Sequence, residues 1–354
     1  MFVLSEKTAN IIKIVLALAA ITIVSRILYL NQLSISSLFK IYFMIAGVFF
    51  IYTQFKRYNM VEFISTVGVI SGIFFLLSFN SQLIVFSSFI LIITSCFGFM
   101  TTRFRPNKNT ISFVYLTLIF ALLYGIAPFL SVLAITVILL MFLFRSKDSS
   151  IDSLIITLLI PTVFYLFLLD LAKQGLDIQA NITTLRIVSL ATMIFISTFF
   201  MSKQFHQRTS CSYSVFYIAH ILFALSINTM ASIIIGLLMI FILPFIYSSK
   251  ANRFSIFNMA MLPPSPVFIL KLSLLGITLN MGYITDYVII LASYTIVLFN
   301  TFRYFYIVEL ENKAKFAVSE KVLGTVSFLV ILVCLIYLNT IKNIVGSALA
   351  NIAG

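Results

Sequence analysis

The chain has 354 residues, of which 62% are hydrophobic and only 9% are charged, and its mean hydropathy is +1.15. A water-soluble domain of this size does not need so much apolar surface, so the composition excludes one. The formal net charge is +13, which can mark a nucleic-acid-binding protein. Here the basic residues lie in short loops between apolar runs, so we expect a lipid bilayer and no nucleic acid as the partner.

Apolar runs of about 17 to 22 residues recur along the whole chain, which is the pattern of a polytopic α-helical membrane protein. The sequence predicts an all-α transmembrane helix bundle of about 13 spans within a single polytopic domain, residues 1–354. The expected spans are 10–29, 38–55, 62–79, 82–101, 110–126, 127–144, 153–171, 184–202, 212–228, 230–248, 256–278, 284–303 and 322–340.

Loops rich in Lys and Arg alternate strictly with loops that are almost uncharged. The basic loops include residues 102–109, 203–211 and 249–255, and the uncharged loops include 80–82, 125–129 and 228–230. The positive-inside rule therefore predicts that the N-terminus lies inside and the C-terminus outside. If residues 261–271 form a hairpin instead of a kink, the chain has one more span and the C-terminus lies inside.

Enzyme and cofactor motifs are missing from the sequence. Cys96, Cys211 and Cys334 are scattered, and neither a GxGxxG nor a GxxxxGK segment occurs. We therefore expect no metal, no cofactor and no catalytic site in this chain.

Several ionisable residues fall near the ends of the predicted spans. A charge within a bilayer costs several kcal/mol unless it is paired or hydrated, but a long side chain near a span end can reach the interface. We expect that position for this group, which is Arg26, Glu62, Asp170, Arg186, Asp286 and Arg303.

Two ionisable residues lie deeper in their spans. His220 is in the middle of the span 212–228, and an imidazole titrates close to working pH, which suits proton relay. Lys271 is the deepest cation, and apolar surroundings disfavour the charged form of an amine, so it is a candidate for a group that exchanges its proton. The alternatives are a buried neutral histidine bonded to a neighbouring group and a lysine that reaches the interface from a packing helix.

The segment "MLPPSPVFILK", residues 261–271, breaks the span that carries Lys271. Pro263, Pro264 and Pro266 remove backbone donors, so helical pairing must be interrupted just before the lysine. The carbonyl groups that lose their partners need water or a neighbouring helix. An irregular, hydrated segment is where a membrane lysine can be accommodated, so we expect Pro263 and Pro264 to form a helix break that serves Lys271.

This segment resembles the G-[L/I]-P-P-x-x-G-F-x-x-K motif of the antiporter-like membrane subunits of respiratory complex I, and in particular subunit N, called subunit 2 in mitochondria. Pro263, Pro264, Phe268 and Lys271 match the motif, while methionine and valine replace its two glycines. The stretch "CSYSVFYIAH", residues 211–220, resembles the start of another helix of that family. A weaker similarity covers the basic loop and following helix at residues 99–118.

The resemblance implies a subunit that contributes to proton translocation or to the structure of the membrane arm, and that holds no cofactor of its own. Lys271 would carry the proton, with His220 as a relay. The implied partners are other membrane subunits of a respiratory complex, in an energy-transducing inner membrane of a mitochondrion or a bacterium. The sequence departs from the family at Ile90 and Val114, which stand near the positions of a membrane glutamate and lysine.

Other functions remain open at this point. A free-standing secondary transporter, such as a related cation/proton antiporter subunit or a small-solute carrier, would also use a broken helix. An envelope lipid or polysaccharide flippase or polymerase is a further alternative, although such proteins usually carry more membrane charges or a large catalytic loop. Co-purification with a flavin- and iron–sulfur-bearing NADH dehydrogenase would favour the complex I reading.

Overall fold

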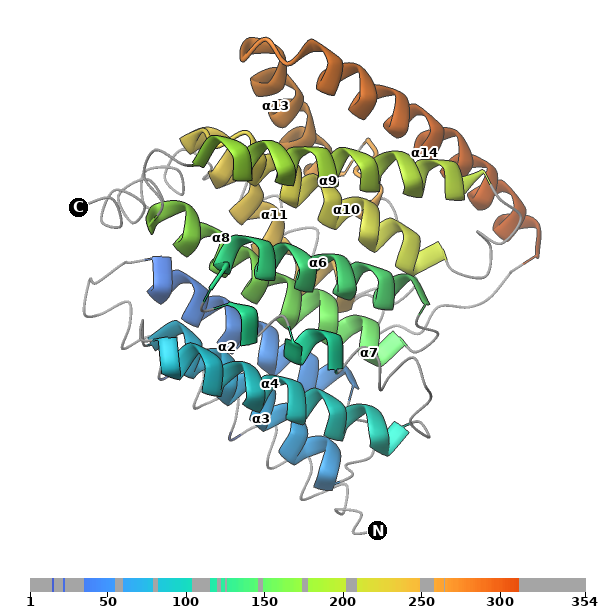
Figure 1. Ribbon diagram of the computed structural model, residues 1–354. Coiled ribbons are helices and arrows are strands. Elements are labelled where there is room, and N and C mark those ends of the chain that lie inside the picture. The colour runs from blue at the N-terminus through green and yellow to red at the C-terminus, as the bar shows by residue number, and fades with distance from the viewer. Residues whose placement is uncertain are drawn as a thin grey trace. The chain divides into compact units, whose positions relative to one another are not determined.

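The computed structural model describes residues 15, 22, 35–54, 60–78, 82–103, 115–119, 122–124, 126–145, 149–173, 178–201, 209–248, 258–263 and 265–311. Regular secondary structure within these residues is entirely helical (Figure 1). The helices in chain order are α2 (Ile35–Gln54), α3 (Met60–Ser78), α4 (Gln82–Arg103), α6 (Pro128–Arg145), α7 (Ser149–Leu154), the π-helix η1 (Ile155–Leu159), α8 (Ile160–Lys173), α9 (Ile178–Phe200), α10 (Thr209–Ser226), α11 (Met230–Ser248), α13 (Pro266–Asn280) and α14 (Ile284–Glu311).

The predicted all-α fold is confirmed, and most span boundaries agree within a few residues. The helix α11 coincides with the predicted span 230–248. Two helices are longer than predicted, because α9 begins at Ile178 and α14 continues to Glu311. The additional turn of α9 is partly polar, and that of α14 carries two glutamates among aromatic and aliphatic residues. A helix can continue past the hydrocarbon region since it satisfies its own backbone groups. Most of the predicted span 10–29, part of 110–126 and all of 322–340 lie outside the described residues.

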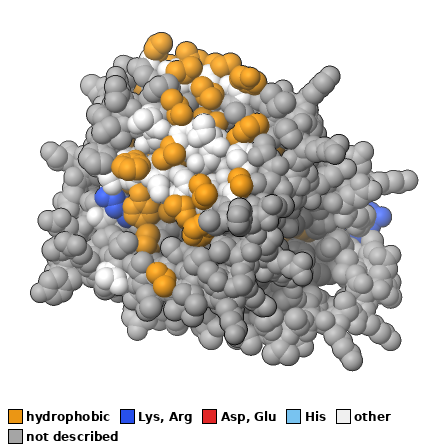
Figure 2. Space-filling model, turned by 90° about the horizontal axis from the view of Figure 1, so that it is seen from below, with side chains coloured by type: hydrophobic (Ala, Val, Ile, Leu, Met, Phe, Trp, Pro, Cys, Tyr) orange, Lys and Arg blue, Asp and Glu red, His pale blue; other side chains and the backbone are white. Residues whose placement is uncertain are grey.

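Length and composition mark three of the described helices as able to cross a membrane: Asp152–Asp170, Ala180–Phe200 and Ile284–Arg303. Shorter apolar helices accompany them. Large apolar side chains are exposed in quantity; Phe75 is 53% and Phe299 is 69% exposed. On the face shown in Figure 2, hydrophobic side chains predominate among the coloured ones. A water-facing surface would not carry so many, so these side chains are suited to contact with lipid.

Contacts divide the described helices into two units. Unit 1 contains the helices from α2 to α8, and unit 2 contains those from α9 to α14. The single polytopic domain expected from the sequence remains a prediction.

In unit 1, α3 and α4 pack along small residues. A Cβ atom added to Gly72 would lie 2.7 Å from Ile92 Cγ1 and 3.2 Å from the Ser88 carbonyl oxygen. A Cβ on Gly98 would lie 2.6 Å from the Ser65 hydroxyl. Small residues let two membrane helices approach closely, and the Gly68-x-x-x-Gly72 spacing on α3 is typical of such contacts.

The buried helix formed by α7, η1 and α8 is interrupted in its middle. Pro161 has no N–H group, so the Thr157 carbonyl one turn earlier loses its usual helical donor. The Tyr42 hydroxyl, from α2, donates a hydrogen bond of 2.8 Å to this carbonyl. The Thr162 hydroxyl donates to the Leu158 carbonyl at 2.8 Å. The Tyr42 hydroxyl thus takes the place of the backbone donor that Pro161 lacks, as a helix interruption inside a membrane requires.

Unit 2 contains a tightly connected set of helices. The turn between α13 and α14 has Gly282 at φ 76°, and the Tyr283 N–H donates to the Thr278 carbonyl while the Gly282 N–H donates to the Leu279 carbonyl. These two hydrogen bonds form a Schellman motif, which requires a residue with left-handed backbone at Gly282. The motif ends α13 and lets α14 begin within a few residues. At the start of α11, Thr229 and Ser232 cap each other's backbone N–H groups at 3.1 Å, which forms a capping box.

Replacement of Gly72 by Ala should weaken unit 1 by about 1–3 kcal/mol, because the added methyl group would meet a backbone carbonyl that cannot move aside freely. Thermal unfolding in detergent measures the effect. The matched control is Gly276→Ala in α13, where nothing lies within 4 Å of the added Cβ. That change should be neutral or stabilising by up to about 1 kcal/mol, because Ala is the better helix former. Equal effects at both positions would contradict the close α3–α4 approach.

Replacement of Tyr42 by Phe should cost about 0.5–2 kcal/mol of stability, because the Thr157 carbonyl would lose its hydroxyl donor. The same change at Tyr115, which is 66% exposed, serves as the control and should have little effect. In a Pro161→Ala background a backbone N–H returns, so Tyr42→Phe should cost less. An unchanged cost in that background would show that the Tyr42 bond does not compensate for the proline.

Candidate proton-relay site

The predicted helix break is present in unit 2 and ends where α13 begins. Ala260 and Met261 lie in a turn, and Met261 has a left-handed backbone with φ 51°. Ser265 is the N-cap of α13, and its hydroxyl oxygen accepts a hydrogen bond from the Phe268 N–H at 3.3 Å. Pro266 occupies the first turn, where a missing N–H costs nothing.

Pro263 and Lys271 are not in the same backbone segment. Pro263 is exposed, and Pro264 lies outside the described residues. Lys271 lies beyond the first turn of α13, in regular helix, whereas the sequence predicts it directly beside the irregular segment. Ser265 and Pro266 explain the difference, because a hydroxyl cap and a proline at the first position allow the helix to restart before the lysine is reached.

Lys271 is buried inside unit 2 and faces aromatic rings. Its side chain is 1% exposed, and its Nζ lies 2.6 Å from the ring centroid of Tyr294 on α14 and 4.9 Å from that of Phe268. Aromatic faces attract a cation. The Nζ atom has no hydrogen-bond partner among the described residues. The expectation that this lysine faces protein and not lipid therefore agrees with the structure.

His220 is fully buried in the middle of α10, at 0% exposure. Its Nδ1 lies 2.9 Å from the Phe216 carbonyl oxygen. A carbonyl oxygen only accepts, so Nδ1 carries the proton and the Nε2 lone pair is left to accept another. Nε2 is unpartnered within the described part of the chain. Both residues singled out in the sequence are thus buried within unit 2, His220 on α10 and Lys271 on α13.

Tyr294 and Thr301 belong to the same buried face of α14, and sequence reasoning did not single them out. The Tyr294 hydroxyl is buried without a hydrogen-bond partner in the described residues. The Thr301 and Tyr213 hydroxyls lie 2.6 Å apart, which joins the end of α14 to the start of α10. Spacing of buried residues by three or four positions along α14 was visible in the sequence, but it is also the spacing of ordinary core residues.

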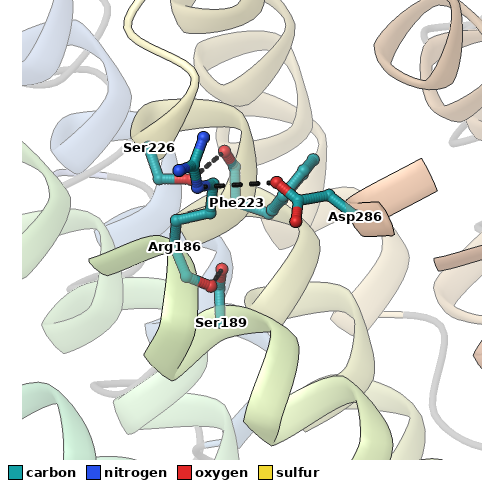
Figure 3. A network of polar contacts seen from close by, with 5 residues as sticks. All are labelled: Arg186, Ser189, Phe223, Ser226 and Asp286. Atoms are coloured by element: carbon teal, nitrogen blue, oxygen red, sulfur yellow. Dashed lines mark hydrogen bonds and ion pairs between the residues drawn. The ribbon is translucent and has the colours of Figure 1, made fainter. Parts of the chain in front are cut away.

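The end of unit 2 opposite the Tyr213–Thr301 contact holds an ion pair that the sequence did not predict. Arg186 Nε on α9 lies 3.5 Å from Asp286 Oδ2 in the first turn of α14. The Arg186 guanidinium also lies over the Tyr283 ring, 4.3 Å from its centroid. Figure 3 shows the pair beside Phe223 and Ser226, at the end of α10.

Arg186 and Asp286 are 21% and 15% exposed and lie against each other. Pairing lowers the cost of a membrane charge, as hydration does. Asp170 is 4% exposed, and Arg303 is exposed near the other end of α14. The interface position expected for these residues stays a prediction. Arg26 and the Glu62 side chain lie outside the described residues.

Comparison with known proteins supports the fold. No protein-family model and no curated protein matches the sequence. Among solved structures, the chain is similar to one in a structure of the Mrp complex from Dietzia sp. DQ12-45-1b, with a TM-score of 0.68 and 10% sequence identity. The match covers 98% of this chain and 93% of the other. At that identity the similarity shows a shared helical membrane fold.

The left-handed backbone at Met261 leads to a specific prediction. A side chain in this conformation costs about 1–2 kcal/mol, which glycine avoids. Met261 is 0% exposed, so burial of its side chain offsets the strain. Replacement of Met261 by either Ala or Gly should therefore destabilise the protein. Met261→Gly should nevertheless be more stable than Met261→Ala by about 1 kcal/mol.

Met239, equally buried but in the middle of α11, is the matched control. There the order should be reversed, with the Gly variant about 1 kcal/mol less stable than the Ala variant, because glycine disfavours helix. Thermal or denaturant unfolding in detergent measures both pairs. The same order at both positions would contradict a strained turn at Met261.

Proposed function

We propose that this chain is an antiporter-like membrane subunit that takes part in proton translocation, with Lys271 as the proton-carrying group and His220 as a relay. The observation that supports this most directly is that unit 2 holds both a buried amine without a hydrogen-bond partner among the described residues and a buried imidazole whose Nε2 can accept a proton. Buried ionisable groups in membrane helices usually serve transport, because their burial is costly.

The chemistry of Lys271 suits uptake and release of a proton. Its charged form is favoured by the Tyr294 and Phe268 ring faces and disfavoured by removal from water. Because these effects oppose each other, neither protonation state is held strongly, as proton transfer requires. The imidazole of His220 can accept a proton on Nε2 and release the one on Nδ1.

The finer proposal is a membrane subunit of a respiratory NADH:quinone oxidoreductase, similar to subunit N, in an energy-transducing inner membrane. The sequence motif around Lys271 supports it. A second candidate is a subunit of a separate cation/proton antiporter complex. The fold similarity to a chain of the Mrp complex supports this second candidate as much as the sequence motif supports the first. Both candidates imply other membrane subunits as partners.

Lys271→Ala should largely abolish proton flux in vesicles of the native membrane, while the amount of assembled chain stays near normal because a small apolar group removes a buried charge. The control is Ser273→Ala, on the exposed side of the same helix. Flux is measured with a pH-sensitive dye, driven first by NADH and then by a sodium or potassium gradient. Dependence on NADH supports the respiratory assignment, and dependence on the cation gradient supports the antiporter. Normal flux at normal assembly would refute the role of Lys271.

A further inference from the structure

The buried polar groups of unit 2 are spaced along its helices from one end of the unit to the other. On α14, Asp286, Tyr294 and Thr301 lie on one face, since they are separated by two helical turns each. At 1.5 Å per residue, Asp286 lies about 12 Å along the axis from Tyr294, and Thr301 about 10 Å on the other side. Tyr294 contacts Lys271, so the relay site lies between the Thr301 hydroxyl and the Asp286 carboxylate.

The helix α10 runs antiparallel to α14. It also carries polar groups near its start, in its middle and at its end. Tyr213 near its start bonds to Thr301, His220 lies in its middle, and Phe223 and Ser226 at its end lie beside the Arg186–Asp286 pair (Figure 3). His220 and Ser226 are therefore separated by less than two turns. The order along α10 is thus Tyr213, His220 and Ser226, and the ion pair lies beside the end of α10 that carries Ser226.

Buried hydroxyl groups lie on α9, α10 and α13, toward the end of unit 2 that holds the ion pair. Ser189, Ser226 and Thr278 are at most 1% exposed, and each donates to a carbonyl oxygen of its own helix at 2.7–2.8 Å. Each hydroxyl oxygen can still accept a hydrogen bond. Thr278 lies two turns beyond Lys271 on the same face of α13, and its carbonyl binds the N–H of Tyr283, the residue whose ring contacts Arg186. Polar acceptors thus continue from Lys271 toward Asp286.

Asp286 supplies the carboxylate at the end of unit 2 that holds the ion pair. It is the one carboxylate of unit 2 whose side chain lies within the described residues, and its Oδ2 has no hydrogen-bond partner there besides the ion-pair contact with Arg186. A clamp that served only to hold α9 against α14 would gain most from hydrogen-bonded, bidentate geometry. The 3.5 Å contact through Nε alone leaves the carboxylate able to take up a proton.

We propose that Asp286 is the terminal proton acceptor of the path through unit 2 and that Arg186 is its positioning residue. This inference rests on the proposed function. A proton leaves the Lys271 ammonium, which becomes an amine, and passes by way of hydroxyl groups or water to the Asp286 carboxylate, which becomes a carboxylic acid. Protonation ends the attraction to Arg186, and loss of the proton to water at this end of the unit restores the ion pair.

The test compares four variants of the full chain in native membrane vesicles. Asp286→Asn keeps the shape but cannot carry the proton, and should lower proton flux by about 100-fold. Asp286→Glu should retain flux. The double variant Arg186→Gln with Asp286→Asn removes both charges together, so no charge is left unpaired. It should assemble normally and still lack flux. Lys271→Ala is the reference for the proposed function.

The outcomes separate the two proposals. Flux that is lost in Asp286→Asn and in the double variant, at normal assembly, supports the inference. If the double variant restores both assembly and flux, the pair is only a helix clamp and the inference is overturned. Normal flux in Asp286→Asn, with flux lost in Lys271→Ala, overturns the inference but leaves the proposed function standing. Normal flux in Lys271→Ala overturns the proposed function itself.

Discussion

The structure depends on one constraint, which is that a polar group inside a membrane protein must find its partner within the protein or in trapped water. Pro161 removes a helical donor in unit 1, and the Tyr42 hydroxyl from α2 replaces it at the Thr157 carbonyl. At the break in unit 2, the Ser265 hydroxyl caps the restarted helix. Both interruptions therefore occur where a neighbouring or local side chain supplies the missing hydrogen bond.

The same constraint governs the charged residues of unit 2. Arg186 and Asp286 touch through one 3.5 Å contact, Lys271 faces aromatic rings and His220 has one carbonyl partner. Each arrangement removes part of the cost of burial and leaves part of it in place. A fully paired charge mainly contributes to helix packing, whereas a group that is only partly compensated can change its protonation state. The buried ionisable groups of unit 2 are therefore suited to proton exchange.

Unit 1 differs from unit 2 in the polar groups that it buries. Its helix interruption is compensated by hydroxyl groups, and Ile90, which stands where the resembled family has a membrane glutamate, is apolar, with its carbonyl accepting a hydrogen bond from Thr94. Val114, the other departure, lies outside the described residues. Buried carboxylates also occur in unit 1, where Asp152 and Asp170 lie near the two ends of the helix formed by α7, η1 and α8 and are 7% and 4% exposed. Unit 2 holds a buried amine and a buried imidazole, and the proposed proton path runs through them.

The sequence by itself determined the all-α membrane fold, most helix boundaries and the candidates Lys271 and His220, because apolar run length and isolated charges are local signals that need no tertiary contact. It also located the break before Lys271, since proline removes a donor in any context. Only the tertiary structure decided that Arg186 pairs with Asp286, that Tyr294 faces Lys271 and that Tyr42 compensates for Pro161. Each of these contacts joins residues far apart in the chain, and the residue types alone do not say which helices become neighbours.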